Sequence, residues 1–301
     1  MAEWIDLLDP SEEEVRAKLP RAVQESALKL LLAPARHADE PRPTLQAHGD
    51  YIFGIFLVAV AVPDEDRVFY QEVDVVVTHD VLLSVSKTPP GEHPYDPRPV
   101  REACRPDDSA GMMLYRFLDD IAERYLDLVD SLDEEIDELE DTVERASPEE
   151  TRTRLSELRH DLLHIRRTLA PTRDAVRRVV DNVVEVETGE EVFPHEVEVA
   201  FNGAYDKLLR AFDGLELSRD LIASVRDYLQ AKIANDQNEV MKKLTVSASV
   251  LLLPTFIVGL YGQNFRHFPE LASQWGYAWS WALIVVTTVA QLAFFRWKRW
   301  I

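Results

Sequence analysis

Cysteine is nearly absent from this 301-residue sequence: Cys104 is the only one, which excludes an internal disulfide and a cysteine-rich zinc site. Basic residues are also in deficit, because 33 Lys and Arg side chains stand against 54 Asp and Glu, a formal charge of −21. A chain of this charge is repelled by phosphate backbones, so we expect no nucleic-acid partner. The first residues contain neither a basic segment nor an apolar run, so no cleavable signal peptide is expected.

Reactive constellations are lacking as well. The sequence contains no P-loop and no GxGxxG motif, so nucleotide-driven pumping has no visible basis. His160 and His164 have the four-residue spacing of a metal-binding pair, but no glutamate follows the first histidine and arginines lie nearby. Two surface histidines are the favoured interpretation, and a two-histidine metal pair is the alternative. We therefore expect neither an enzyme nor a resident cofactor.

Charge is missing altogether from two long runs near the end of the chain. Leu244–Leu260 is uncharged over 17 residues and Tyr277–Phe295 over 19. As helices they would extend roughly 25 and 28 Å, close to the thickness of a bilayer core. Five of the six tryptophans follow residue 274 and cluster at the run ends, as interfacial aromatic belts do. A buried helical hairpin is the alternative, but core helices rarely lack a polar face. We predict transmembrane helices at 244–262 and 277–296.

The charges that flank these runs predict their orientation. Lys242 and Lys243 precede the first run, and a basic tail at 297–301 follows the second, next to Arg296. The intervening loop, 263–276, carries little charge, so the positive-inside bias places both termini in the cytoplasm of a multi-pass protein of the inner (cytoplasmic) membrane. Two helices cannot enclose a pore, so any transport would require an oligomer.

Residues 1–106 are predicted to form a cytoplasmic α/β domain. Ser11 begins a capping-box sequence, and runs rich in β-branched and aromatic residues predict strands at 51–62, 68–78 and 81–85. The stretch 88–106 contains six prolines and a glycine, so we expect neither a helix nor a central strand there.

Residues 107–190 are predicted to form an antiparallel helical hairpin, with an acidic helix followed by a basic one. Positions 127–144 hold ten carboxylates and no Lys or Arg, and Ser147 begins the second helix with a capping box. The acidic run either collects or senses divalent cations, or it is a solvated face whose negative charge the arginines of the second helix compensate. The second interpretation is favoured. From near His195 a helical pattern continues without proline to Pro254, so 191–243 is predicted as the cytoplasmic part of a stalk about 90 Å long.

One face of the helix that enters the membrane is smaller and more polar than the rest. At steps of three and four, it reads Asn238, Met241, Thr245, Ala248, Leu252, Thr255 and Gly259. Such a face suits a water-filled path, and small residues also suit helix packing in lipid. The sequence pattern leaves these two alternatives nearly even.

The residues at the outer end of this helix resemble a known family signature. Tyr261-Gly262-Gln263-Asn264-Phe265 resembles Tyr-Gly-Met-Asn-Phe, the signature of the CorA family of divalent-cation channels. The similarity covers the whole chain in architecture and about residues 195–301 in motif detail. The other segments that resemble the family are Phe268-Pro269-Glu270-Leu271, Trp275-Gly276-Tyr277, Asn238-Glu239-Val240-Met241-Lys242, the stalk segment from Tyr205-Asp206 to Arg219-Asp220, and the basic aromatic tail.

This resemblance implies a homopentameric funnel in the lipid bilayer, with an α+β cytoplasmic domain, a long stalk helix and two transmembrane helices in each chain. It implies transport of Mg²⁺ as substrate. The outer mouth would be formed by Tyr261, Gly262, Gln263 and Asn264, with Asn264 holding the metal ion through water. The implied pore-lining residues are Asn238, Leu244, Thr245, Leu252, Thr255 and Gly259.

Two departures from the family pattern bear on the function. Gln263 replaces the methionine of the signature, so Zn²⁺, Co²⁺ or Ni²⁺ are alternative substrates. The family's regulatory acid aligns with Gly203, and Asp206, Glu198 or the acidic helix are the candidates to replace it. A membrane-anchored oligomer that conducts nothing is the alternative from a different class.

Overall fold

The computed structural model describes residues 2–21, 23–35, 40–62, 67–184, 186, 191–263 and 273–301. The chain divides into two compact units, Met1–Val225 and Arg226–Ile301. The predicted fold class is confirmed: an α+β unit is followed by a long helix and a second C-terminal helix.

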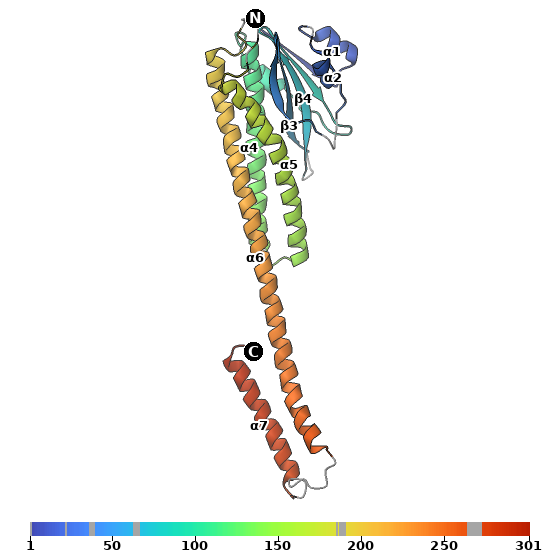
Figure 1. Ribbon diagram of the computed structural model, residues 1–301, viewed down its shortest axis with the longest axis vertical. Coiled ribbons are helices and arrows are strands. Elements are labelled where there is room, and N and C mark those ends of the chain that lie inside the picture. Colours follow the sequence, from blue (N-terminus) through green and yellow to red (C-terminus); the bar gives the residue numbers. More distant parts are fainter. Residues whose placement is uncertain are drawn as a thin grey trace. The chain divides into compact units, whose positions relative to one another are not determined.

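A five-stranded sheet forms the centre of the first unit, with the strand order β1-β5-β4-β3-β2 (Figure 1). β1 pairs parallel with β5, and the other neighbours are antiparallel. The predicted strands at 51–62, 68–78 and 81–85 are confirmed, whereas β1 and β2 were not predicted. The strands are β1 (Glu3–Leu8), β2 (Thr44–His48), β3 (Tyr51–Ala61), β4 (Val68–Val77) and β5 (Val81–Lys87).

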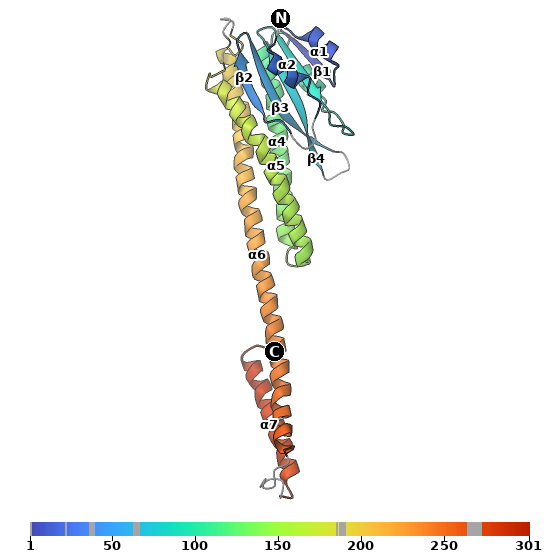
Figure 2. The same ribbon diagram turned by 45° about the vertical axis from the view of Figure 1, so that its right-hand side comes forward.

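Helices cover both faces of this sheet, which explains why β3 and β4 are buried over nearly their whole length. On one face, α1 (Glu12–Lys18) and α2 (Glu25–Leu31) place Val15 and Leu31 against Phe53 and Val76 (Figure 2). On the other face, Phe117 makes edge-to-face contacts with Trp4 and Phe56. A sheet covered on both faces reads as continuous apolar runs.

Local capping sets the start of α1, whereas one prediction about the proline-rich stretch is wrong. The Ser11 Oγ accepts a hydrogen bond from the Glu14 N–H, and the Glu14 carboxylate accepts one from the Ser11 N–H at 2.8 Å, which confirms the capping box. Within 88–106, where we expected no helix, the structure has the short helix α3 (Arg98–Glu102). Pro97 and Pro99 lie at its cap and first turn, where no N–H has to be donated within the helix.

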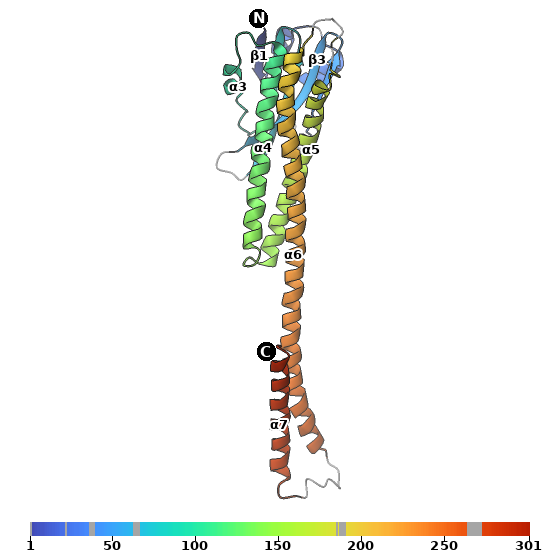
Figure 3. The same cartoon turned by 90° about the vertical axis from the view of Figure 1, so that its left-hand side faces the viewer.

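Two long helices, α4 (Ala110–Thr142) and α5 (Pro148–Val180), form the predicted antiparallel hairpin (Figure 3). Ser147 caps α5 in the predicted capping box. An ion pair between Glu135 and Arg154 joins the acidic and the basic helix. The apolar positions between the charges are buried: Val129, Leu132, Ile136 and Leu139 on α4.

A buried group of charges lies in the sheet of the first unit. The Lys87 Nζ lies 2.5 Å from a carboxylate oxygen of Glu72 and 2.6 Å from one of Asp74, and it donates to the Leu30 carbonyl. All three charged side chains are at most 10% exposed. Burial raises the pKa of Asp74 to about 7, and the nearby Lys87 opposes this shift.

The helix α6 (His195–Tyr261) is 67 residues long and passes Pro254 without a break, as the sequence predicted. In the first unit its residues Phe201, Leu208 and Leu215 are buried, and ion pairs link it to α4 through Lys207 and to α5 through Glu216. α4 and α6 begin inside the predicted segments 107–190 and 191–243, and those boundaries themselves stay predictions.

The second unit consists of the C-terminal part of α6 and the helix α7 (Gly276–Trp297). Both helices are long and apolar enough to cross a membrane. The Gln291 Nε2 of α7 donates to the Ser249 carbonyl of α6 at 3.3 Å, so the two helices lie side by side here (Figure 3).

Candidate functional site

The helix α6 has two different faces in the second unit, because α7 covers only one of them. Val246 and Ile257 are buried, and Ser249, Val250 and Leu253 between them are half-buried. These positions follow each other at steps of three and four, so they form one stripe along the helix. That stripe is the contact with α7.

The polar and small residues singled out in the sequence lie on the face of α6 turned away from α7. At about 100° per residue, Thr255 lies almost opposite Val246 and Ile257, whereas Thr245 lies about 100° from Val246 at the border of this face. All six of the implied pore-lining residues are exposed in the single chain: Asn238, Leu244, Thr245, Leu252, Thr255 and Gly259. We call this set the open face of α6. The exposed fractions of Leu244 and Leu252 are 60% and 73%, which is unusual for leucine unless lipid or another chain covers it.

The two threonines of the open face have a definite hydrogen-bonding polarity. The Thr245 hydroxyl donates to the Met241 carbonyl at 2.8 Å, and the Thr255 hydroxyl donates to the Leu251 carbonyl at 2.7 Å. Because each hydroxyl hydrogen is used inside the helix, the oxygen lone pairs are left to accept hydrogen bonds from outside. The open face therefore presents acceptors and a few apolar side chains.

At the outer end of the open face, α6 ends in a tight turn. The Gly262 N–H donates to the Val258 carbonyl at 2.9 Å, and Gly262 and Gln263 are exposed. A Cβ atom at Gly262 would lie 3.2 Å from the Val258 carbonyl oxygen, so a larger residue would crowd this turn. Tyr261 is half-buried at the last helical position. Asn264, the fourth implied mouth residue, lies outside the described residues.

At the other end, the C-terminal tail returns to the base of the open face. The Trp300 ring stacks on Phe295 with centroids 5.7 Å apart, and Trp300 lines a groove together with Asn238, Lys242 and Thr245. The basic aromatic tail therefore borders the polar end of α6.

The acidic candidates for regulation are not brought together in one chain. Glu198 is half-buried and forms an ion pair with His195 at 3.5 Å, whereas Asp206 is exposed, about 12 Å further along the helix. Gly203 is also exposed. Among the residues that the structure describes, no group of three or more His, Cys, Asp or Glu side chains could hold a metal ion, the acidic helix included.

The two histidines four residues apart differ in their surroundings. His160 is exposed, as expected, whereas the His164 side chain is 35% exposed and has specific partners. Its ring is half-buried, lies 2.7 Å from a Glu40 carboxylate oxygen and contacts the Tyr70 ring at 4.5 Å between centroids. The strand β4 and the segment before β2 create this environment, which the local sequence around His164 does not reveal.

One polar residue of the membrane-spanning part was missed in the sequence. Gln291 lies within the second uncharged run, and its side chain donates to α6 near Pro254. An amide in an otherwise apolar span is the signal that could have identified it, because such side chains join helices in lipid.

Comparisons with known proteins identify the family and the fold of this chain. The family model described as "CorA-like Mg2+ transporter protein" matches residues 2–299. The "Cobalt/magnesium transport protein CorA" of Thermotoga maritima is 29% identical over 269 residues, which cover 86% of this chain and 73% of that protein. Two solved structures show the same fold at 22% identity. The complete CorA magnesium transporter from Methanocaldococcus jannaschii has a TM-score of 0.79 and covers 99% of this chain and 91% of its own. The full-length CmaX protein has a TM-score of 0.73 and covers 99% and 89%. This chain belongs to the CorA-like Mg²⁺ transporter family.

Proposed function

We propose that this chain is the subunit of a channel that carries divalent cations, Mg²⁺ first, across the cytoplasmic membrane along the open face of α6. The observation that carries this proposal is the position of the open face. α7 covers the apolar stripe with Val246 and Ile257, whereas Thr245 and Thr255 are exposed outside that stripe. The curated relative in Thermotoga maritima is named as a transporter of cobalt and magnesium, which supports the substrate class.

The proposed assembly is a homopentamer in the lipid bilayer. One chain offers two spans, 244–262 and 277–296, which cannot enclose a pore, so several copies must turn their open faces toward a common axis. Lys242, Lys243 and Arg296 support a cytoplasmic location of both termini under the positive-inside bias. The loop 263–276 would then be on the outer side, where the ion enters.

The chemistry of the open face suits an ion that keeps its water shell. Mg²⁺ gives up its water reluctantly, and its bound waters are hydrogen-bond donors. The threonine oxygens of the open face accept such hydrogen bonds, as would the amide oxygens of a Gly-Gln-Asn mouth at residues 262–264. Asn264 would hold the ion through water. A ring of carboxylates would bind the ion more tightly and slow its release.

Two leucines would close the proposed path, and the membrane potential would drive the ion through it when it is open. Leu244 and Leu252 would form hydrophobic constrictions that close the path by losing water. When the path is hydrated, an interior-negative potential drives influx by about 4.6 kcal/mol per divalent ion per 100 mV. Regulation by cytoplasmic metal would use Asp206 or Glu198, contributed by different chains because one chain keeps them apart.

Ion flux into liposomes containing the purified full chain tests the proposal. Mg²⁺, Zn²⁺, Co²⁺ and Ni²⁺ uptake would be compared under a negative-inside potential. We expect Mg²⁺ flux and its loss in Asn264→Ala. Thr255→Val should slow flux at least about tenfold, because about 0.5 kcal/mol of hydrogen bonding is lost in each of five subunits.

Thr287→Val on α7 is the matched control for Thr255→Val. Its hydroxyl also donates to the carbonyl four residues earlier at 2.7 Å, but it does not lie on the open face. Equal loss of flux in both variants would refute the assignment of the open face. Flux of Zn²⁺ alone would correct the substrate, which the Gln263 position leaves open. No flux of any ion from an intact oligomer would favour a non-conducting membrane oligomer.

A further inference from the structure

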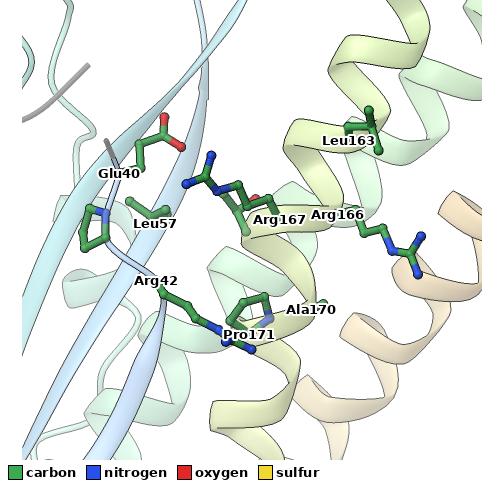
Figure 4. Close-up of a pocket in the computed structure, with 10 residues that line it drawn as sticks. Glu40, Arg42, Leu57, Leu163, Arg166, Arg167, Ala170 and Pro171 are labelled. Carbon is green, nitrogen blue, oxygen red and sulfur yellow. The ribbon is translucent and has the colours of Figure 1, made fainter. Parts of the chain in front are cut away.

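A cavity of about 510 Å³ lies in the first unit, and all of its described lining residues belong to that unit. One wall is the segment leading into β2, with Glu40 and Arg42, and the other is the middle of α5, from Leu163 to Pro171 (Figure 4). Leu57 of β3 lies between them. Cavities of roughly 300–1,000 Å³ are typical of sites for small molecules.

The lining of this cavity is basic, which is unexpected in a chain with a charge of −21. It contains three arginines, and they differ in their partners. Arg166 points away from the cavity in Figure 4 and forms an ion pair with Glu216 of α6 at 3.2 Å. In the described part of the chain, no carboxylate oxygen lies within 4.0 Å of a guanidinium nitrogen of Arg42 or Arg167, so neither forms an ion pair there. Guanidinium groups stay charged at all physiological pH values.

Among the lining residues that the structure describes, Glu40 is the one carboxylate, and it does not neutralise these two arginines by direct contact. Glu40 lies at the edge of the cavity, and its carboxylate forms a hydrogen bond with the His164 ring at 2.7 Å. Within the described lining, the guanidinium charges of Arg42 and Arg167 are thus available to an anion that enters the cavity. A guanidinium fork matches the oxygens of phosphate with two parallel hydrogen bonds.

The remaining wall is apolar and would contact the organic part of a ligand. Leu57 is 1% exposed and closes the cavity on the strand side, whereas Leu163 is 52% exposed at its edge. Pro171 has no N–H, so the carbonyl of Arg167, four residues earlier, loses its donor within the helix. This carbonyl can accept a hydrogen bond from a hydroxyl or amino group. Two arginines in the lining, together with apolar side chains and a carbonyl acceptor, fit a phosphorylated organic molecule better than a bare anion.

From this arrangement we infer that the cavity between the segment before β2 and α5 binds a small organic phosphate of the nucleotide type. Arg42 and Arg167 hold the phosphate groups, and Leu57, Leu163 and Pro171 contact the organic part. The site is separate from the open face of α6, so its ligand is neither the transported ion nor a part of the conduction path.

Binding to the purified full chain in detergent tests this inference without any measurement of transport. ADP, inorganic phosphate and adenosine would be titrated separately by calorimetry in buffer free of Mg²⁺. We expect ADP to bind most tightly, phosphate more weakly and adenosine not measurably. Arg42→Gln and Arg167→Gln should each weaken ADP binding by about tenfold or more, since each removes charge-assisted hydrogen bonds.

Arg177→Gln is the matched control, because Arg177 is also on α5 but is exposed and paired with Asp181 at 3.1 Å. It should leave ADP binding unchanged. Protection of the wild-type chain provides a measurement that needs no variant: ADP should shield Arg42 and Arg167, but not Arg177, from phenylglyoxal, as read by mass spectrometry.

Four results would overturn the inference. They are no ADP binding at millimolar concentration, adenosine binding as strong as ADP binding, the same loss in Arg177→Gln as in Arg42→Gln, and equal phenylglyoxal labelling with and without ADP. Phosphate binding as strong as ADP binding would overturn the assignment of the apolar wall. Failure of ion flux in liposomes would leave this test unaffected.

Discussion

Replacing Lys87 by methionine tests how the first unit tolerates buried charge. The Lys87 Nζ is the cation between Glu72 and Asp74, and methionine has a similar length but neither charge nor donors. The variant therefore leaves two buried carboxylates, one of which is fully buried, without a compensating cation. Removing one partner of a buried ion pair costs about 3–5 kcal/mol, because the remaining charge is left in a medium of low polarity.

The loss should depend on pH in a defined direction. Burial raises the pKa of Asp74 to about 7, far above the 3.8 of an ordinary aspartate. Between pH 4 and 7 the folded chain therefore binds more protons than the unfolded chain, and this carboxyl destabilises the fold progressively as the pH rises through that window. In Lys87→Met the attraction that favours the ionised carboxylate is gone. We expect the destabilisation to be largest at pH 8 and clearly smaller at pH 5.

Urea unfolding of the full chain in detergent measures this effect, with Trp4 as the probe. Trp4 is buried in the sheet, and its ring N–H donates to the Ser84 hydroxyl at 2.9 Å. The other five tryptophans would be phenylalanine in every protein compared, so that fluorescence reports only on the first unit. Adding Asp74→Asn to Lys87→Met should recover part of the lost stability, since it removes one of the two buried charges.

The control is Lys29→Met, which removes the same side chain from an exposed pair with Glu25 and should cost less than about 1 kcal/mol. A loss in Lys87→Met no larger than in Lys29→Met would refute the reasoning. A loss that grows as the pH falls from 8 to 5 would also refute it, because the sign would be opposite to that of a carboxyl with a raised pKa.

Two further predictions concern the helices that pack on the sheet. Gly111→Ala should destabilise the first unit by about 1–3 kcal/mol or more, because the new Cβ would lie 2.2 Å from the Val192 carbonyl oxygen and force the segment before α6 to move; an unchanged melting temperature would contradict this close approach. Ser147→Ala should cost about 1 kcal/mol and speed amide hydrogen exchange in the first turn of α5, since it removes the acceptor of the Glu150 N–H; exchange that stays at the wild-type rate would show that the cap is dispensable.

Much of the fold could be predicted from the sequence because its signals are local. The strands β3, β4 and β5 are rich in β-branched residues. Ser11 and Ser147 predict the helix starts because each forms a capping box with the glutamate three residues later. β1 was missed because its identity as a strand depends on parallel pairing with β5, far away in the chain. A high proline content does not predict α3, because proline disfavours the interior of a helix, whereas the first turn accepts it.

The open face of α6 could be predicted from the sequence in part, whereas the cavity in the first unit could not. The spacing of Thr245, Leu252 and Thr255 places them on one face, and the structure adds that α7 packs on a different stripe of the helix. A periodic pattern specifies which residues share a helix face, but it does not specify what that face contacts. The sequence therefore could not distinguish helix packing in lipid from a water-filled path. The cavity with Arg42 and Arg167 could not be predicted at all, because only the tertiary fold brings the segment before β2 to α5.

If the open face lines the proposed ion path, the threonine hydroxyls that donate to their own helix determine whether it favours cations or anions. From Leu244 to Leu260 there is no Asp, Glu, Lys, Arg or His, so discrimination between cations and anions along this stretch would depend on dipoles alone. Oxygens that can only accept stabilise the outward-pointing hydrogens of a cation's water shell and disfavour the inverted shell of an anion. Such a lining has no proton to gain or lose, and its preference for cations would stay constant across the pH range of a cell.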